Sequence, residues 1–261
     1  MRKGVVYIAS GKKFIDEARQ SASSLKDRMP ELNITIISDD KVEDKCFDKW
    51  IFLKKTENVK LYKIAGMPHS PYEHTLFLDT DTYVCSDLSE IFTLLQKYDI
   101  GVAQAELRAG KNLLGESYNY QQSIDCDGRF IFPIYNSGVI IYKKSPEIEK
   151  FFKDWFSLAE QQMQEKGTKY GDQPSFQLSL HKSNLREVVL TPEYNCRFVF
   201  PVCVSGIVKI LHGRHPDLPA IAKEINSEIS TRLFHPRWGL ILDRKSQMLK
   251  KVLTNQTDNF L

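Results

Sequence analysis

The chain has 261 residues, 42% of them hydrophobic, so it can bury a full core in one large domain with or without a small appendage. Its 36 lysines and arginines nearly balance its 33 acidic residues, and a net charge of +3 gives no indication of a nucleic-acid partner or an anionic membrane. Because the five cysteines lack zinc spacing, no apolar run approaches about 18 residues and the start lacks a signal-peptide pattern, we expect a cytoplasmic protein with free thiols and no transmembrane segment.

The N-terminal part of the chain predicts a strand, a helix and a second strand. Val5–Ser10 is apolar and β-branched, apolar residues recur at helical spacing over Phe14–Met29, and Ile34–Ser38 is again β-branched. This order is typical of the start of a nucleotide-binding α/β unit. Neither the glycine fingerprint of dinucleotide-binding folds nor a P-loop is present.

The most informative stretch is Leu-Phe-Leu-Asp-Thr-Asp at positions 76–81, after a predicted short helix at Val59–Gly66. Its three apolar residues predict a buried strand, and Asp79 and Asp81 follow where that strand ends. Ligands of open α/β sheets lie just outside the carboxyl ends of the strands. Two carboxylates one residue apart can converge on Mg²⁺ or Mn²⁺, which also bind substrate phosphates. The stretch therefore predicts a metal and diphosphate site.

Other interpretations of this Asp-x-Asp pattern are open. Aspartate is common in turns and at helix caps, and Asp87-Leu-Ser-Glu90 is itself a cap signal, so an isolated Asp-x-Asp is more often structural than catalytic. Phosphatases of the haloacid dehalogenase type carry a similar motif with Thr or Val at its fifth position. Here that position is Tyr83, and Thr82 comes one residue early.

A second motif, Asn136-Ser137-Gly138, leads into a predicted strand at Val139–Tyr142. Glycine allows a backbone to lie against a ligand, and asparagine can both donate to and accept from sugar hydroxyls, although an ordinary turn fits these residues equally well. The polar, glycine-containing segment Glu106–Phe130 before it is either a binding loop or an irregular surface segment.

Two further motifs follow. Asp172 and Gln173 precede Pro174 at a predicted helix start, where they can cap the helix, project into a cleft, or do both. The predicted strand Ile207–Leu211 ends in His212-Gly-Arg-His215. A histidine there is either inert or a third metal ligand beside the two aspartates, and Arg214 can hold a phosphate through two hydrogen bonds.

The four motifs, in this order, resemble the GT-A glycosyltransferases, and within them the retaining family that includes glycogenin and bacterial lipopolysaccharide galactosyltransferases. The resemblance runs from about Val5 to His215 and includes the spacing of Val59–Tyr62, Thr75–Val84 and Asp87–Phe92. It implies an α/β fold with a mostly parallel, Rossmann-like sheet flanked by helices. We expect a nucleotide-sugar-binding catalytic domain over residues 1–215, with residues 216–261 as a helical C-terminal extension packed on the core.

The resemblance also implies roles for individual residues. Asp79, Asp81 and His212 would bind Mn²⁺ or Mg²⁺, which bridges the donor diphosphate, and Asp172 and Gln173 would lie near the anomeric carbon. The remaining residues implied in donor or acceptor binding are Ile8, Ser10, Phe14, Lys60, Thr80, Asn136, Ser137, Gly138, Gly213 and Arg214. The implied reaction moves a sugar from a nucleotide-sugar, UDP by resemblance, to a hydroxyl acceptor with retention, in glycan or glycoconjugate synthesis.

The chain departs from the family pattern in two places. The family often ends with His-x-x-Gly-x-x-Lys-Pro-Trp, which here is shortened to His212-Gly-Arg-His215, so Arg214 would replace the lysine. Position 169, often acidic in the family, is Lys169, and no tyrosine is assigned as a self-glucosylation site. Two other classes therefore stay open: another Asp-x-Asp metal enzyme, either nucleotidyltransferase or phosphatase, and a non-catalytic nucleotide-sugar-binding protein. The sugar, the acceptor and the oligomeric state are not predicted.

Overall fold

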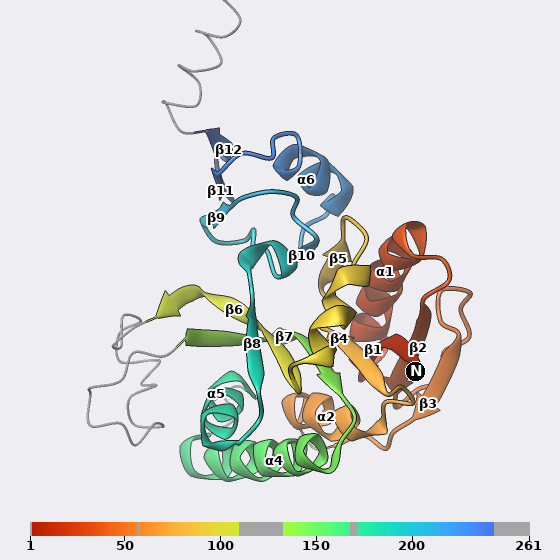
Figure 1. Cartoon of the computed structure of the whole chain (residues 1–261). Coiled ribbons are helices and arrows are strands. Elements are labelled where there is room, and N and C mark those ends of the chain that lie inside the picture. The colour runs from red at the N-terminus through yellow and green to blue at the C-terminus, as the bar shows by residue number, and fades with distance from the viewer. Residues whose placement is uncertain (1, 57, 110–132, 168–171, 243–261) are drawn as a thin grey trace, which may run out of the picture.

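The computed structural model describes residues 2–56, 58–109, 133–167 and 172–242 (Figure 1). Its centre is a seven-stranded sheet in the order β3-β2-β1-β4-β7-β6-β8. The strands are β1 Lys3–Ala9, β2 Asn33–Ser38, β3 Lys49–Phe52, β4 His74–Leu78, β6 Ile100–Ala109, β7 Pro133–Lys143 and β8 Glu187–Leu190. Only β7 runs antiparallel to its neighbours, β4 and β6. The predicted mixed α/β fold with a mostly parallel sheet is confirmed.

Helices cover both faces of this sheet (Figure 1). One face packs against α1 (Lys12–Arg28) and the 3₁₀ helix η2 (Ser89–Gln96). The other packs against α2 (Val59–Gly66), α4 (Pro146–Lys166) and α5 (Asp172–Lys182). Along β1, Val5 and Tyr7 join the first core and Val6 and Ile8 the second. A strand buried on both faces is apolar throughout, which is why the predicted strands read as continuous apolar runs.

Two small sheets lie beyond the carboxyl ends of the central strands. In the first, β5 (Thr82–Val84) pairs antiparallel with β10 (Ile210–His212). The second has the order β12-β11-β9 and comprises β9 Val202–Val204, β11 Arg232–His235 and β12 Gly239–Leu242. Together with α6 (Leu218–Ile225) it packs around a third apolar cluster that includes Phe198 and Phe234. The pairing of β10 with β5 brings this later part of the chain close to the end of β4, where the Asp-x-Asp motif lies.

The structure corrects two predictions. Asn136–Gly138 is not a turn before a strand but lies within β7, where Asn136 pairs with Ala103 on β6 beyond a register shift. The C-terminal extension is not helical throughout, because α6 ends at Ile225 and two strands occupy 232–242. Buried and exposed residues alternate along β11, which is the period of a strand rather than of a helix.

Some predictions lie wholly or partly outside the described residues: the polar segment after residue 109, Lys169, and the part of the helical extension after residue 242. The division between residues 215 and 216 stays a prediction, although β9 on one side pairs with β11 on the other. No helix within the described ranges has the length and apolar character needed to cross a membrane. The cytoplasmic location also stays a prediction.

Candidate active site

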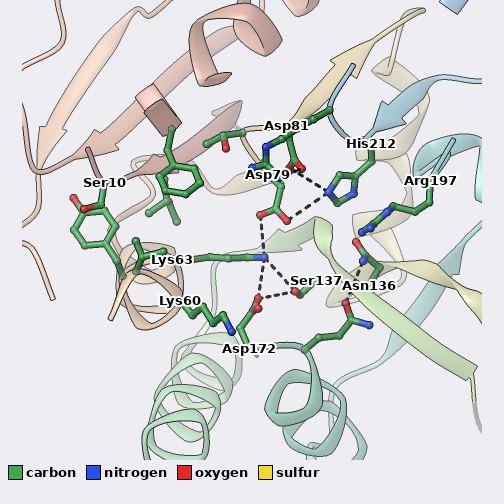
Figure 2. A pocket seen from close by; sticks show the side chains of 17 residues that line it. Ser10, Lys60, Lys63, Asp79, Asp81, Asn136, Ser137, Asp172, Arg197 and His212 are labelled. Atoms are coloured by element: carbon green, nitrogen blue, oxygen red, sulfur yellow. Dashed lines mark hydrogen bonds and ion pairs between the residues drawn. The ribbon is translucent and has the colours of Figure 1, made fainter. Parts of the chain in front are cut away.

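The Asp-Thr-Asp turn (Asp79–Asp81) joins β4 to β5. The backbone N–H of Asp79 donates to the carbonyl of Gly138 at 2.8 Å, so the pairing of β4 with β7 continues into the turn. The carbonyl of Asp79 accepts from the N–H of Thr82 at 3.3 Å and from its hydroxyl at 2.8 Å, which closes the turn. The side chains of Asp79 and Asp81 point into one cavity at the edge of the sheet (Figure 2).

Strand pairing brings His212 to these two carboxylates. His212 is the last residue of β10 and lies opposite Thr82 on β5, and the N–H of Gly213 donates to the carbonyl of Asp81 at 2.9 Å. As a result, Nε2 of His212 lies 3.3 Å from Oδ1 of Asp81 and 3.7 Å from Oδ2 of Asp79. One ligand atom from each of the three residues lies within 4.8 Å of the other two. The predicted triad is therefore assembled.

The hydrogen bonds of His212 suit a metal ligand. Its Nδ1 lies 2.7 Å from Oδ1 of Asn195, whose amide is oriented because Nδ2 donates to the carbonyl of Gln104 at 3.3 Å. An amide oxygen only accepts, so Nδ1 donates to Asn195 and Nε2 is the ring nitrogen that faces the two carboxylates. Such an outer hydrogen bond is the usual partner of a metal-binding histidine. Oxygen and nitrogen donors converging in this way fit Mn²⁺ or Mg²⁺.

Gly138 lies behind the triad, and its lack of a side chain has a steric reason. A Cβ atom there would lie 2.2 Å from Cε1 of His212 and 2.8 Å from Oδ2 of Asp79. This glycine therefore makes room for two of the three triad side chains, and the expectation that it lies against a ligand stays a prediction.

A buried lysine links the triad to the second predicted catalytic motif. Nζ of Lys63, on α2, lies 2.9 Å from Oδ1 of Asp79 and 3.1 Å from Oδ2 of Asp172. It also donates to Oγ of Ser137 at 3.1 Å, and Ser137 in turn donates to Asp172 at 2.8 Å (Figure 2). Gln173 accepts from the amide of Asn136 at 3.2 Å. Asp172 and Gln173 are therefore fixed on the wall opposite the triad.

These contacts separate the pKa values of the three carboxyl groups. Burial raises the pKa of Asp79. Burial also opposes ionisation of Asp81, but the hydrogen bond and charge of His212 and the charge of Arg214 outweigh it and lower that pKa. For Asp172, burial is likewise outweighed, here by Lys63 and Ser137, so its pKa is lowered. The two aspartates raise the pKa of Lys63 to about 12 in spite of its burial. At neutral pH, Lys63 is therefore cationic and Asp172 anionic.

The cavity has a volume of about 390 Å³ and extends from Ser10 at one end to Arg197 at the other (Figure 2). This volume is within the range of small-molecule sites. Most of the predicted site residues line it: Ile8, Ser10, Phe14, Lys60, Asp79, Thr80, Asp81, Asn136, Ser137, Asp172, Gln173, His212 and Arg214. Gly138 lies behind the triad, and Gly213 instead lines a neighbouring cavity of about 340 Å³.

The sequence matches no protein-family profile and no curated protein. Solved structures, however, are similar. The glycosyltransferase GlyE of Streptococcus pneumoniae TIGR4 aligns with a TM-score of 0.57 and 18% identity over 84% of this chain, which spans 55% of that protein. The galactosyltransferase LgtC, in complex with donor and acceptor sugar analogues, aligns with a TM-score of 0.56 and 13% identity over 83% of this chain and 88% of its own. An active-site mutant of LgtC aligns with a TM-score of 0.57 and 12% identity over 82% of this chain and 88% of its own.

The chain has the fold of these glycosyltransferases. It is the fold that the four motifs predicted, and it places their residues around one cavity.

Four lining residues were not among the predicted site residues: Val59, Tyr62, Lys63 and Arg197. Lys63 could have been predicted as a site residue, because it lies three residues after Lys60 on a predicted helix and residues at that spacing share a face. Arg197 and Asn195, the hydrogen-bond partner of His212, could not, because both lie in irregular chain after η3 (Pro192–Tyr194). The bridge of Cys196 with Leu211 on β10, which itself pairs with β5, brings that segment to the cavity.

Proposed function

We propose that the chain is a metal-dependent glycosyltransferase that moves a sugar from a UDP-sugar to a hydroxyl acceptor with retention of configuration. The observation that carries this proposal is the convergence of Asp79, Asp81 and His212 in one cavity with Asp172 and Gln173. A fold shared with glycosyltransferases supports it, as does the presence of the four motifs in the order of the family, with the fourth shortened.

The triad would hold Mn²⁺ or Mg²⁺, which supplies positive charge against the leaving diphosphate. The chain adds cations of its own on the same side of the cavity: Nζ of Lys63 at 2.9 Å from Asp79, and the guanidinium of Arg214 at 3.1 Å from Asp81. Lys60 lines the cavity beside them. As the bond from sugar to phosphate breaks, negative charge grows on the phosphate oxygens. Fixed cations stabilise that charge mostly in the transition state.

Asp172 and Gln173 are the residues proposed to act beside the anomeric carbon. Lys63 and Ser137 hold Asp172 in its ionised form and fix its orientation, so it can stabilise positive charge on the sugar but cannot act as a general acid. Gln173, fixed by Asn136, can contribute its amide oxygen or N–H group to the sugar or the acceptor. Both suit a retaining transfer in which the carbohydrate passes through a cation-like transition state.

The test is a screen of UDP-, GDP- and dTDP-sugars for release of nucleoside diphosphate with and without Mn²⁺, followed by an acceptor screen with the donor that responds. We expect slow, Mn²⁺-dependent hydrolysis of one UDP-sugar, because water replaces the acceptor. The anomeric configuration of the transferred sugar, read by NMR, tests retention.

Other results would assign the site differently. Release of pyrophosphate would indicate a nucleotidyltransferase, and release of phosphate from simple esters a phosphatase. Calorimetric binding of a UDP-sugar without hydrolysis or transfer to any acceptor would indicate a binding protein. Neither binding nor turnover with any donor would contradict the proposal as a whole.

A further inference from the structure

Glu17, on α1, makes contacts that none of the four motifs explains. Its carboxylate receives two parallel hydrogen bonds from Arg214: Nε to Oε1 at 2.7 Å and Nη2 to Oε2 at 2.9 Å. The hydroxyl of Thr80 donates to the same carboxylate at 3.0 Å. Glu17 thus connects α1 to the middle of the Asp-Thr-Asp turn and to the residue that follows Gly213. The Glu17 side chain is 18% exposed, whereas that of Arg214 is 53% exposed.

Arg214 lies at the boundary between two cavities. Together with Thr80 and Asp81 it lines the cavity of about 390 Å³ that we propose to bind the donor, here called the donor cavity. The same three residues also line the neighbouring cavity of about 340 Å³. Glu17 lines only the neighbouring cavity. The carboxylate of Glu17 therefore binds Arg214 from the side of the neighbouring cavity and does not cover the side of the guanidinium that faces the donor cavity.

The hydrogen-bond donors of Arg214 also indicate that its guanidinium can bind a group in the donor cavity. A guanidinium has five N–H groups, and two of those of Arg214 donate to Glu17. Its Nη1 also forms an ion pair with Oδ2 of Asp81, at 3.1 Å. Three N–H groups of Arg214 donate no hydrogen bond to the described residues and can bind a further acceptor. A phosphate oxygen next to a cation held by Asp81 is such an acceptor, and arginine binds phosphate through paired hydrogen bonds.

We propose that Glu17 is a positioning residue that holds the guanidinium of Arg214 toward the donor diphosphate. This inference rests on the proposed function and extends it to a residue outside the motifs. A long, half-exposed arginine loses much rotamer freedom when it binds a phosphate, and a carboxylate that orders it beforehand removes part of that loss. Without Glu17, the side chain of Arg214 is free to turn into the neighbouring cavity.

The experiment is calorimetric titration of UDP and UMP in the presence of Mn²⁺, with the full chain and four variants. Glu17→Gln removes the charge, Glu17→Asp keeps the charge but shortens its reach, and Arg214→Ala removes the group being held. The double variant Glu17→Gln/Arg214→Ala completes the cycle. Asp16→Asn is the matched control, because Asp16 is the adjacent carboxylate on α1 and forms an ion pair with Arg19 on the same helix.

We expect Glu17→Gln and Glu17→Asp to weaken UDP binding about tenfold and UMP binding about twofold or less, because UMP lacks the outer phosphate. In the Arg214→Ala background, Glu17→Gln should have no further effect, whereas a merely structural role would add its full loss. Asp16→Asn should bind UDP as the natural chain does.

Three results would overturn the positioning role while leaving the proposed function intact: unchanged UDP binding in both Glu17 variants, equal losses for UDP and UMP, or tighter UDP binding. The last would mean that Glu17 draws Arg214 away from the donor. If the natural chain showed no Mn²⁺-dependent binding of UDP, the proposed function and the positioning role would both fail.

Discussion

The two ends of the cavity in Figure 2 are built in different ways. The end that we propose to bind the nucleoside, here called the nucleoside end, is formed by Ile8, Ser10 and Phe14 and comes from one strand and the start of the next helix. Its main polar support is Asp39 at the end of β2, which accepts from the hydroxyl of Ser10 at 2.6 Å and from the N–H of Gly11 at 2.9 Å. One local strand–helix–strand unit is enough to make it.

The metal end is assembled from elements far apart in the chain. Its triad comes from the β4–β5 turn and from β10, Lys63 comes from α2, and Asp172 comes from α5. The charges of these groups neutralise one another across the cavity, so the pKa of each carboxyl group and of Lys63 depends on the charges of the others. Substitutions at the metal end should therefore have large, charge-dependent effects, and those at the nucleoside end small effects independent of the metal.

The largest expected effect is that of Asp81→Ala. The variant loses a metal ligand and the partner of Arg214, so Mn²⁺-dependent turnover should fall by about a thousandfold or more. Removing a carboxylate from a polar cavity should leave the fold intact, as judged by circular dichroism and thermal unfolding. Asp154→Ala, which removes an exposed carboxylate on α4, is the control. Metal-dependent turnover at the natural rate in a folded Asp81→Ala variant would refute the assignment.

This contrast also explains what the sequence could predict. The strand Leu76–Leu78, the aspartates after it and the helix at Val59–Gly66 follow from short-range periodicity, and the structure has them in place. For His212 the residues alone left two interpretations open, an inert histidine or a third metal ligand, because its contact with Asp81 depends on the pairing of β10 with β5. No local pattern encodes that pairing.

What the sequence missed has the same physical origin. The steric need for Gly138 could not be predicted, because this glycine leaves room for His212, which lies 74 positions later in the chain. The strands β11 and β12 lie within the C-terminal extension that was predicted to be helical. Only the alternation of burial, fixed by the pairing of β11 with β9, distinguishes a strand from a helix there.

The next effect concerns Lys63, whose charge joins the triad to Asp172. We expect Lys63→Met to lower kcat by about a hundredfold, because two carboxylates then lose their shared cation. Lys63 lowers the pKa of Asp172, so its removal raises that pKa, and the acid limb of the kcat profile should move to higher pH. Lys150→Met, on the exposed face of α4, is the control. An unchanged acid limb would show that ionised Asp172 does not govern the reaction.

A smaller effect is expected from Gly138→Ala, which alters the metal end without changing any charge. The added Cβ atom would lie 2.2 Å from Cε1 of His212, so the imidazole must shift, and Mn²⁺ affinity should fall about tenfold. Gly167→Ala is an informative control. Gly167 has a φ of 83° and open space around its Cα, so this variant should lose stability through backbone strain but bind Mn²⁺ normally. Equal Mn²⁺ affinities in Gly138→Ala and the natural chain would exclude the steric role of Gly138.

The smallest effect is expected at the nucleoside end, from Ser10→Ala. Burial raises the pKa of Asp39, but the hydrogen bonds from Ser10 and Gly11 outweigh it, so the pKa is lowered in the folded chain. A lowered pKa stabilises the fold above about pH 4, and that contribution is lost as the pH falls through the folded value. Ser10→Ala should therefore cost about 1 kcal/mol of unfolding free energy at pH 7, measured with urea, and less at pH 3.

The same variant should raise the KM for the UDP-sugar only two- to threefold, by about 0.5 kcal/mol, with no change in the Mn²⁺ concentration that gives half-maximal rate. Ser23→Ala, on α1 and outside the cavity, controls for general loss of a hydroxyl. A change in the Mn²⁺ requirement of Ser10→Ala would mean that the two ends are coupled. In that case the nucleoside end would not be an independent local unit, and the contrast between the ends would have to be abandoned.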